Sequence, residues 1–475
     1  DRMSYEGCPI GNVSSEFVYM PKDKGKEHFV DGTLSMDNYE VCTLTGMYNA
    51  EGEGSINADM TLQRTPLLLL NGLVPDKLLT FMGYAQGEVK VKGSLARPEV
   101  NGELYFDSAY VASEPYGVKM RLCDDQLAIN NSRMQFENFQ LFARNGNALT
   151  LYGYFDFADF DRMQTYLRMR ADNYLLIDSK ENARSEAYGK AYVNFLGLVD
   201  GPLDALRMRG KLDVLGSSNV TYILRDSPLS TESQLDGLVK FVNFRKPETA
   251  TVAKPPINGL NMDLTVNVDD GAHVLCALNP DKSNYVDLIG GGNLRMLYTA
   301  IDGLSLYGRY TIAEGEMKYS LPVIPLKTFT IKNGSYAEFS GDPMNPRLNI
   351  TATEENKTTV ATDGGSGRSV MFECGVEITK TLQDMGLQFI IDAPDDQQMH
   401  NELMTQSVEN RGKLAVTMLT TGMYLSDNNL GSLSVNSALS SFLSSQINSI
   451  SGSALRTLDL SFGMDNTTLG TGEVH

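Results

Sequence analysis

The sequence predicts an all-β fold, in which a long, curled antiparallel sheet forms an open hydrophobic groove and two helices follow near the C-terminus. Three observations support this prediction. Apolar and polar residues alternate in short runs from about residue 27 to residue 392, and glycine, asparagine, aspartate or proline separates the runs. A pattern anchored on glycine also recurs about every 100 residues. Alternation with a period of two is typical of strands that bury one face.

Residues 329–352 show the alternation most clearly. Phe329 and Ile331 fall on one face of a strand, and Asn333-Gly334 supplies a turn because both residues tolerate positive φ. The alternation resumes on the other side of the turn. We therefore expect this segment to form a hairpin with one apolar face.

The glycine pattern indicates that the sheet is assembled from similar units. Its first glycines are spaced by 102 and 103 residues, and each is followed by a chain reversal and a second glycine. The first glycines are Gly87, Gly189 and Gly292, and the second are Gly102, Gly210 and Gly308. A repeat of this kind favours units stacked along one axis, although the turn glycines of any meander could also recur by chance. We expect residues 1–394 to form an elongated β-groove of about 100-residue units.

Two stretches near the C-terminus have helical spacing. Residues 395–425 place large apolar residues at every third or fourth position, and residues 432–455 form one apolar stripe on a serine-rich helix. We expect residues 395–456 to form a helical cap on the end of the sheet. In an alternative interpretation the second helix lies on a membrane surface, but it lacks the lysine and arginine typical of such helices. Residues 457–475 return to alternation and are expected to begin a further, truncated β segment.

Charge and motifs argue against several classes of protein. The net charge of −19 disfavours a nucleic-acid partner, because binding a phosphate backbone requires a basic surface. The five cysteines lie far apart and none of the four histidines belongs to a ligand pair, so neither a metal nor a cofactor is expected. A nucleophile elbow and a dinucleotide-binding loop are also absent from the sequence. We therefore expect a protein that is not an enzyme.

The sequence is expected to be a fragment of a longer protein. Its densest apolar run, residues 65–74, has about half of the roughly 20 residues that a membrane-spanning helix requires. The first residues lack the apolar core of a signal peptide, and the last residues break off within an alternating run. Both ends therefore look cut.

Three segments carry a family resemblance. They are "GEVKVKGSLARPEVNGELYF" at residues 87–106, the run over residues 302–354, and "LQFIIDAPDD" at residues 387–396, which a helix follows. Together they resemble the carboxy-terminal region of the TamB family of AsmA-like envelope proteins. The middle segment is the most specific, because its phenylalanine, glycine and proline positions follow the family pattern. The resemblance covers most of the chain and is closest between about residues 290 and 425.

This resemblance implies a bridge-like carrier in the periplasm of a Gram-negative bacterium. Such a protein transports phospholipids between the inner and outer membranes through a hydrophobic β-groove and contributes to outer-membrane integrity. Its partners would be phospholipid acyl chains and an Omp85-type outer-membrane barrel, with an inner-membrane anchor outside this fragment. The resemblance also implies a second function, as an assembly factor for outer-membrane proteins that acts with such a barrel. From the residues alone, a rigid surface adhesin or stalk whose apolar face is its own core stays open.

The residues expected to line the groove share the glycine-anchored alternation and should form one continuous concave face. They are Val89, Val91, Leu95, Leu104, Phe106, Leu149, Leu151, Val193, Met208, Leu212, Leu294, Met296, Leu304, Leu306, Phe329, Ile331 and Phe339. Their side chains are aliphatic or aromatic, so burial against them is non-directional and suits a sliding chain. Lipid binding is accordingly expected to depend little on the headgroup or on salt.

Overall fold

The computed structural model confirms an all-β fold with a long sheet and two helices near the C-terminus. Strands contain 69% of the residues that the structure describes, and helices contain 9%. The described residues are 2–5, 8–73, 79–113, 117–183, 185, 187–223, 259–278, 280–319, 327–361, 366–382 and 384–424. The second predicted helix, over residues 432–455, and the further β segment, over residues 457–475, lie outside them.

The chain divides into two compact units, each with its own hydrophobic clusters. As far as it is described, unit 1 comprises residues 1–218, 251–267 and 295–305. Unit 2 comprises the described residues of 219–250, 268–294 and 306–475. Three strands contribute residues to both units: β16 (Leu260–Val268), β18 (Tyr285–Thr299) and β19 (Gly303–Tyr319).

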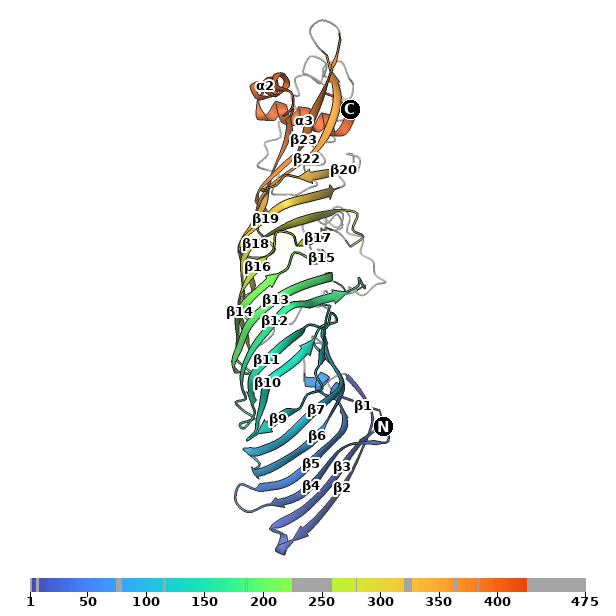
Figure 1. Ribbon diagram of the computed structural model, residues 1–475, viewed down its shortest axis with the longest axis vertical. Helices are drawn as coiled ribbons and strands as arrows, with labels where there is room; N and C mark the ends of the chain where they lie inside the picture. Colours follow the sequence, from blue (N-terminus) through green and yellow to red (C-terminus); the bar gives the residue numbers. More distant parts are fainter. Residues whose placement is uncertain are drawn as a thin grey trace, which may run out of the picture. The chain divides into compact units, whose positions relative to one another are not determined.

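Unit 1 is an antiparallel meander, in which most strands pair with their neighbours in the sequence (Figure 1). Its strands are β1 (Arg2–Tyr5), β2 (Cys8–Lys22), β3 (Glu27–Met36), β4 (Tyr39–Asn49), β5 (Ser55–Pro66), β6 (Thr80–Ser94), β7 (Pro98–Ser113), β8 (Val118–Leu122), β9 (Leu127–Asn130), β10 (Arg133–Phe142), β11 (Ala148–Asp156), β12 (Gln164–Ser179), β13 (Ala187–Pro202) and β14 (Leu206–Val214). Strands β1 to β7 pair in chain order, and so do β10 to β14. The short strands β8 and β9 each pair with both β7 and β10. Two 3-10 helices, η1 (Asp23–Gly25) and η2 (Leu67–Leu73), follow β2 and β5.

The register of these pairs gives the sheet of unit 1 two chemically different faces. Directly opposed residues lie on the same face of a sheet. One row of opposed residues runs from β4 to β12 through Leu44, Met60, Val89, Gly102, Ile129, Met134, Phe155 and Thr165. The adjacent row, on the other face, runs through Thr45, Asp59, Lys90 and Asn101. We call the first the apolar face and the second the polar face of unit 1.

Four of the β-bulges in unit 1 keep long strands in phase with the apolar face. A bulge adds one residue to one strand, so the alternation on that strand shifts by one position. In β10, for example, Phe136 and Phe139 oppose Gly153 and Leu151, so both phenylalanines lie on the apolar face although three positions separate them. The bulged strands carry a non-glycine residue with positive φ at each site, namely Arg64, Ser108, Asn138 and Asn173.

Glycines on the apolar face allow neighbouring backbones to approach closely. A Cβ atom built on Gly87 would lie 2.1 Å from the carbonyl oxygen of Glu103, and one built on Gly102 would lie 2.2 Å from that of Glu88. The corresponding distance from Gly210 to the carbonyl oxygen of Leu196 is 2.2 Å. Real Cβ atoms do not approach a backbone this closely, and glycine within a strand is typical of a sharp bend. The recurrent glycines of the sequence therefore have a structural reason.

Unit 2 continues the same architecture and adds two helices. Its elements are β15 (Asn219–Ile223), β17 (His273–Ala277), β20 (Lys327–Ile331), β21 (Tyr336–Gly341), β22 (Arg347–Val360), β23 (Arg368–Thr381), β24 (Asp384–Asp392), α2 (Gln397–Thr405) and α3 (Val408–Thr421). Strands β22 to β24 form an antiparallel meander, whereas β15 pairs with β17 in parallel. Parallel pairing requires a long crossover, and about 50 residues separate these two strands. Among the strand pairs whose register the structure describes, the sheet is thus antiparallel except for the pair of β15 and β17.

The helical stretch predicted over residues 395–425 forms two helices because it contains two capping sites. The Asp396 carboxylate accepts a hydrogen bond from the Met399 amide at 2.9 Å, and α2 begins there. The Ser407 hydroxyl accepts one from the Asn410 amide at 3.1 Å and begins α3. Helix α3 ends at Gly422, which adopts the left-handed conformation that terminates many helices.

If close backbone approach requires glycine, then Gly210→Ala should be more damaging than Gly32→Ala. Both glycines lie in strands of unit 1, but the nearest atom to a Cβ at position 32 is a side-chain carbon of exposed Phe17, at 3.3 Å. That ring can move, whereas the Leu196 backbone cannot. We expect Gly210→Ala to lower the free energy of unfolding by about 1–3 kcal/mol and Gly32→Ala to change it by less than about 0.5 kcal/mol. Urea denaturation of the two variants provides the comparison, and equal effects would contradict this reading of the glycines.

Candidate functional site

The apolar face of unit 1 contains nine of the residues that the sequence predicts to line a groove. Val89 and Val91 on β6 oppose Gly102 and Val100, and Leu104 and Phe106 follow on β7. The register extends the same face to the remaining five residues, which are Leu149, Leu151, Val193, Met208 and Leu212. Residues from β6 to β14 that are far apart in the sequence thus share one face.

Much of this face is only half-buried. Val89, Leu151 and Val193 are buried, whereas Leu104, Phe106, Leu149, Met208 and Leu212 keep part of their side chains accessible to solvent. A closed core of the same composition would bury nearly all of these groups, because each buried aliphatic or aromatic side chain stabilises a fold by about 1.5–3 kcal/mol. The face therefore offers apolar surface to a ligand.

Sequence reasoning missed a set of aromatic residues at the β2 end of this face. Phe17 and Tyr19 oppose Gly32 and Val30 on β3, and they are 65% and 51% exposed. The Tyr19 ring stacks on the ring of His28 at 4.9 Å between centroids and hydrogen-bonds to it through the hydroxyl. The alternating run "SEFVYM" carries the signal that could have identified them.

Leu95 does not belong to the apolar face. Strand β6 ends at Ser94 and β7 begins at Pro98, so Leu95 lies in the bend between them. Its side chain is 50% exposed. The sequence run from residue 87 to residue 106 places Leu95 in phase with Val89 and Val91. The phase is lost because the chain reverses direction at this point.

In unit 2, strand pairing also places predicted lining residues on one face. Leu306, Gly308 and Tyr310 on β19 oppose Gly341, Phe339 and Ala337 on β21, so Leu306 and Phe339 share this face. A Cβ on Gly308 would lie 3.2 Å from the Cα of Leu294, which places Leu294 directly beside it on β18. Two further residues predicted to line the groove lie in parts of β18 and β19 that belong to unit 1. Met296 on β18 is half-buried, and Leu304 on β19 is exposed.

Phe329 and Ile331 lie in a sealed core instead of lining an open groove. Both are buried in a cluster that includes Phe372, Cys374 and apolar residues of α2 and α3. The two helices cover the apolar side of β23 and β24: Cys374 Sγ lies 3.2 Å from Met418 Sδ, and the Phe372 ring stacks on Tyr424 at 5.0 Å. Burial raises the pKa of the Cys374 thiol far above its usual range. Helices α2 and α3 thus shield the apolar side of the last described strands from solvent.

Two tyrosines place buried hydroxyl groups among apolar side chains. Tyr174, in β12 of unit 1, is 2% exposed and packs with Ala171 and Val193. Burial raises its pKa well above the usual value, and in Tyr310 of unit 2 burial raises the pKa to about 12. Neither hydroxyl has a hydrogen-bond partner within the described residues. A buried polar group without a partner destabilises a fold by about 1–3 kcal/mol.

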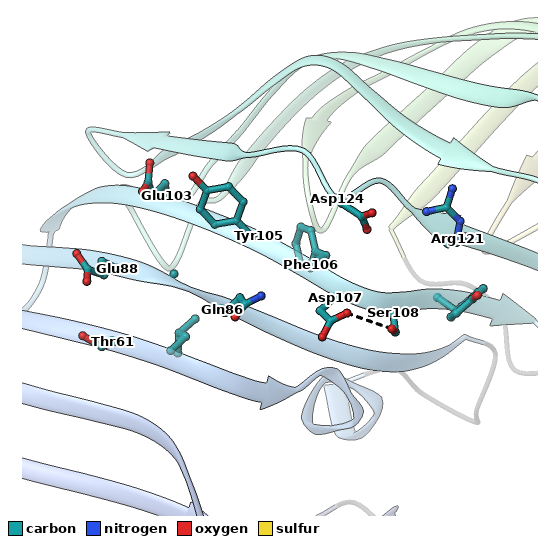
Figure 2. A pocket seen from close by; sticks show the side chains of 13 residues that line it. Thr61, Gln86, Glu88, Glu103, Tyr105, Phe106, Asp107, Ser108, Arg121 and Asp124 are labelled. Atoms are coloured by element: carbon teal, nitrogen blue, oxygen red, sulfur yellow. Dashed lines mark hydrogen bonds between the residues drawn. The ribbon is translucent and has the colours of Figure 1, made fainter.

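The polar face carries a pocket of about 760 Å³ with acidic walls (Figure 2). Glu88 and Glu103 oppose each other on β6 and β7, and Asp107 and Asp124 lie further along the wall. Figure 2 shows the Asp107 carboxylate accepting a hydrogen bond from the neighbouring Ser108 hydroxyl, at 3.1 Å. Among the described residues, no three or more histidine, cysteine or acidic side chains are grouped so that they could hold a metal ion. This pocket presents carboxylates to water.

The described histidines make single polar contacts. The His273 ring bonds to Asp287, and Nδ1 of His400 lies 2.7 Å from the Asp392 carboxylate. Asp392 is the last residue of β24, and α2, which carries His400, packs against this strand.

These features define an all-β protein whose long sheet is apolar on one side, with two helices that cover its last strands. Residues 137–474, well over half of the chain, match the family described as the TamB C-terminal domain. The chain therefore belongs to the TamB family, as the sequence resemblance predicts, which indicates a protein of the bacterial envelope. A comparison with curated proteins found no match. None of the described helices is long and apolar enough to cross a membrane.

Removal of the buried hydroxyl in Tyr174→Phe should stabilise unit 1. The expected gain in the free energy of unfolding is about 1 kcal/mol, because the phenylalanine ring fills the same space without a polar group to desolvate. Tyr152→Phe serves as the control, since the exposed Tyr152 hydroxyl donates to Asn138 at 3.2 Å and its loss should be neutral or slightly destabilising. Thermal unfolding measures both changes, and a clear loss of stability in Tyr174→Phe would reveal a partner for its hydroxyl.

The helical cap provides a second test. Leu403 is 0% exposed and Met404, the next residue in α2, is 45% exposed. We expect Leu403→Ala to destabilise the cap by about 2–5 kcal/mol, because it leaves a cavity in the cluster, and Met404→Ala to have little effect. Hydrogen exchange of the α2 and α3 amides reports local stability, and similar exchange in the two variants would argue against a sealed cap.

Proposed function

We propose that this chain carries phospholipids between the inner and outer membranes, with acyl chains bound along its apolar face. The observation that supports the proposal is the face of unit 1, which links half-buried apolar residues such as Leu104, Phe106 and Met208 across successive strands. Membership of the TamB family supports the same conclusion, because it places the chain among envelope proteins.

The energetics of the face suit a transported chain. Each buried methylene contributes about 0.8 kcal/mol, so a tail of about 16 carbons exposed to water costs on the order of 10 kcal/mol. Contacts with leucine, valine, phenylalanine and methionine remove much of this cost without a directional bond. Neighbouring positions on the face are chemically alike, so a tail can pass from one to the next across a low barrier. Methionine adapts its shape readily, which suits contact with a moving ligand.

The proposed setting is the periplasm of a Gram-negative bacterium, where an apolar tail needs protection from water. In this proposal an inner-membrane anchor lies outside the chain, an Omp85-type barrel is the partner at the outer membrane, and nucleic acid is not a partner. The function is transport without catalysis, needs no cofactor or metal, and contributes to outer-membrane integrity.

Two alternatives make different demands on the apolar face. An assembly factor for outer-membrane proteins would bind its client or barrel by adding strands at a sheet edge, and its apolar face would need no lipid. A rigid adhesin or stalk would use the face as its own filled core. The half-buried state of Leu104, Phe106 and Leu212 favours a ligand over a filled core in unit 1.

Photo-crosslinking tests the proposal directly. A photoreactive residue in place of Leu212, on the apolar face, should form adducts with phospholipid in cells. The same residue in place of Leu196 should not, because Leu196 lies on the polar face and is 59% exposed. Equal crosslinking at both positions, or adducts only with protein at position 212, would refute lipid carriage along this face.

A charge on the apolar face should block transport more than it unfolds the protein. Met208→Arg places a guanidinium where a tail must pass, yet the position is half-buried and the charge can stay partly hydrated. Leu196→Arg adds the same group to the polar face and should preserve function. The measurements are the thermal melting of each purified variant and the outer-membrane barrier in cells that carry it. If Met208→Arg melted below growth temperature, position 208 would be sealed core.

A further inference from the structure

Four hairpin turns of unit 1 expose a large apolar residue at their tips. Turns that face water usually consist of polar residues, glycine and proline. The β6–β7 turn instead presents Leu95, and the β11–β12 turn presents Phe160. The β13–β14 and β18–β19 turns present Leu203 and Ile301. All four side chains belong to unit 1 and are between 45% and 95% exposed. We call them the rim residues.

Contacts between the turns place the first three rim residues along one edge of the sheet. Arg97 of the β6–β7 turn forms an ion pair with Asp159 of the β11–β12 turn, with 3.4 Å between Nη2 and the carboxylate. The Leu203 amide donates to the carbonyl oxygen of Met163, which also belongs to the β11–β12 turn, at 3.2 Å. Each hairpin adds two strands of about 4.8 Å, so the tips of neighbouring hairpins lie about 10 Å apart.

The β18–β19 turn continues the same edge. A Cβ on Gly259, the residue before β16, would lie 2.7 Å from the carbonyl oxygen of Asp204 in the β13–β14 turn. Strand β16 pairs with β18, and Arg295 near the end of β18 donates to the Asp263 carboxylate near the start of β16 at 2.8 Å. Ile301 therefore extends the row. Apolar side chains scattered singly over a surface are ordinary, but several at one edge indicate a binding surface.

Exposed carboxylates accompany the rim residues. In three of the four turns an aspartate directly follows the rim residue, and its side chain is exposed. These aspartates are Asp161, Asp204 and Asp302. At the opposite edge of the sheet, the β10–β11 turn instead exposes the polar residues Arg144 and Asn145. The edge that carries the rim residues thus combines apolar anchors with negative charge.

This combination favours a protein partner over a membrane or a second copy of the chain. The carboxylates would be repelled by anionic lipid heads, and segments that lie on membranes are usually rich in lysine and arginine. Two copies of this edge facing each other would bring aspartates together, which is unfavourable. A protein surface with basic groups beside apolar pockets complements the edge, because the pockets bury the rim residues and the basic groups pair with the aspartates.

We propose that this edge of unit 1 docks a protein whose surface carries apolar pockets flanked by lysine or arginine. The rim residues are the anchors, since a few large side chains in pockets carry most of the binding energy of an interface. The inference goes beyond the proposed function and leaves the apolar face free for lipid. It also accounts for Leu95 and for Leu304, which is 43% exposed next to the β18–β19 turn, two residues that the alternation placed in the groove.

Photo-crosslinking in cells that express the full-length chain tests the docking edge. A photoreactive residue replaces Phe160, Leu203 or Ile301, one at a time, and the control position is the exposed Asn145 at the opposite edge. All three rim positions should form an adduct with the same protein, and position 145 should not. Mass spectrometry of the adducts should find lysine or arginine beside apolar residues in the crosslinked peptides of the partner.

Substitutions at the other turns should weaken the adduct formed at position 203. Phe160→Ser/Ile301→Ser removes two anchors and should lower the yield about tenfold. Asp161→Asn/Asp302→Asn removes two charges and should lower it about threefold. The matched control, Leu196→Ser, removes an apolar residue of similar exposure from the polar face and should keep the yield. Circular dichroism of the purified variants checks that each one folds.

Several results would overturn the docking edge. Phospholipid adducts at the rim positions would assign the edge to a membrane, and adducts between two copies of the chain would assign it to self-association. Equal adducts at position 145, an unchanged yield in Phe160→Ser/Ile301→Ser, or no adduct at any rim position would show that the edge has no specific partner. Phospholipid adducts at position 212 report lipid carriage separately, so either proposal can fail while the other stands.

Discussion

The structure of unit 1 depends on how closely neighbouring backbones can approach on the apolar side of the sheet. At Gly87, Gly102 and Gly210 a side chain would meet the carbonyl oxygen of the next strand, so only glycine fits. Large aliphatic and aromatic residues lie between these glycines, so the face alternates bulky side chains with positions that have no side chain. The close approach of the backbones that requires glycine therefore also limits how tightly the side chains of this face can pack. Half-buried residues such as Leu104 and Phe106 are the result.

The apolar face of unit 1 contains both the buried positions that stabilise the sheet and the half-buried positions between them. On the polar face, cross-strand ion pairs such as that of Lys90 with Asp59, at 3.7 Å, are exposed and contribute little to stability. Stability comes chiefly from buried positions such as Val89, Ile129 and Val193, which anchor local clusters on the other face. The half-buried positions between these anchors can change their contacts without loss of the fold. In the proposed function, a sheet organised in this way would exchange acyl chains while its strands stay paired.

Alternation was sufficient to predict the fold class and nine residues of the apolar face, because strand periodicity is a local property of sequence. It failed wherever the chain departs from regular pairing. Leu95 keeps the phase of its strand but lies in a bend, and Phe329 and Ile331 keep theirs but lie beneath two helices. The pocket lined by Lys119, Arg144 and Asp178 was not predictable, since these residues come from three segments that only tertiary pairing brings together. The bulge at Asn138 was visible in the sequence as a break in the alternation. Only the register with β11 shows that Phe136 and Phe139, on either side of the bulge, lie on the same face.

The four bulges bear on how such a chain can vary in length during evolution. Loss of one residue from a regular strand turns every following side chain to the opposite face, which would expose the apolar residues and bury the charged ones. At a bulge the outcome differs, because one residue there has no counterpart on the partner strand. Deletion at Asn138 would leave Phe136 and Phe139 opposite Gly153 and Leu151, with the face preserved and only the local twist changed. Related chains can therefore differ by a single residue at the four bulge positions, which are Arg64, Ser108, Asn138 and Asn173. Elsewhere, long strands are expected to change length in steps of two residues.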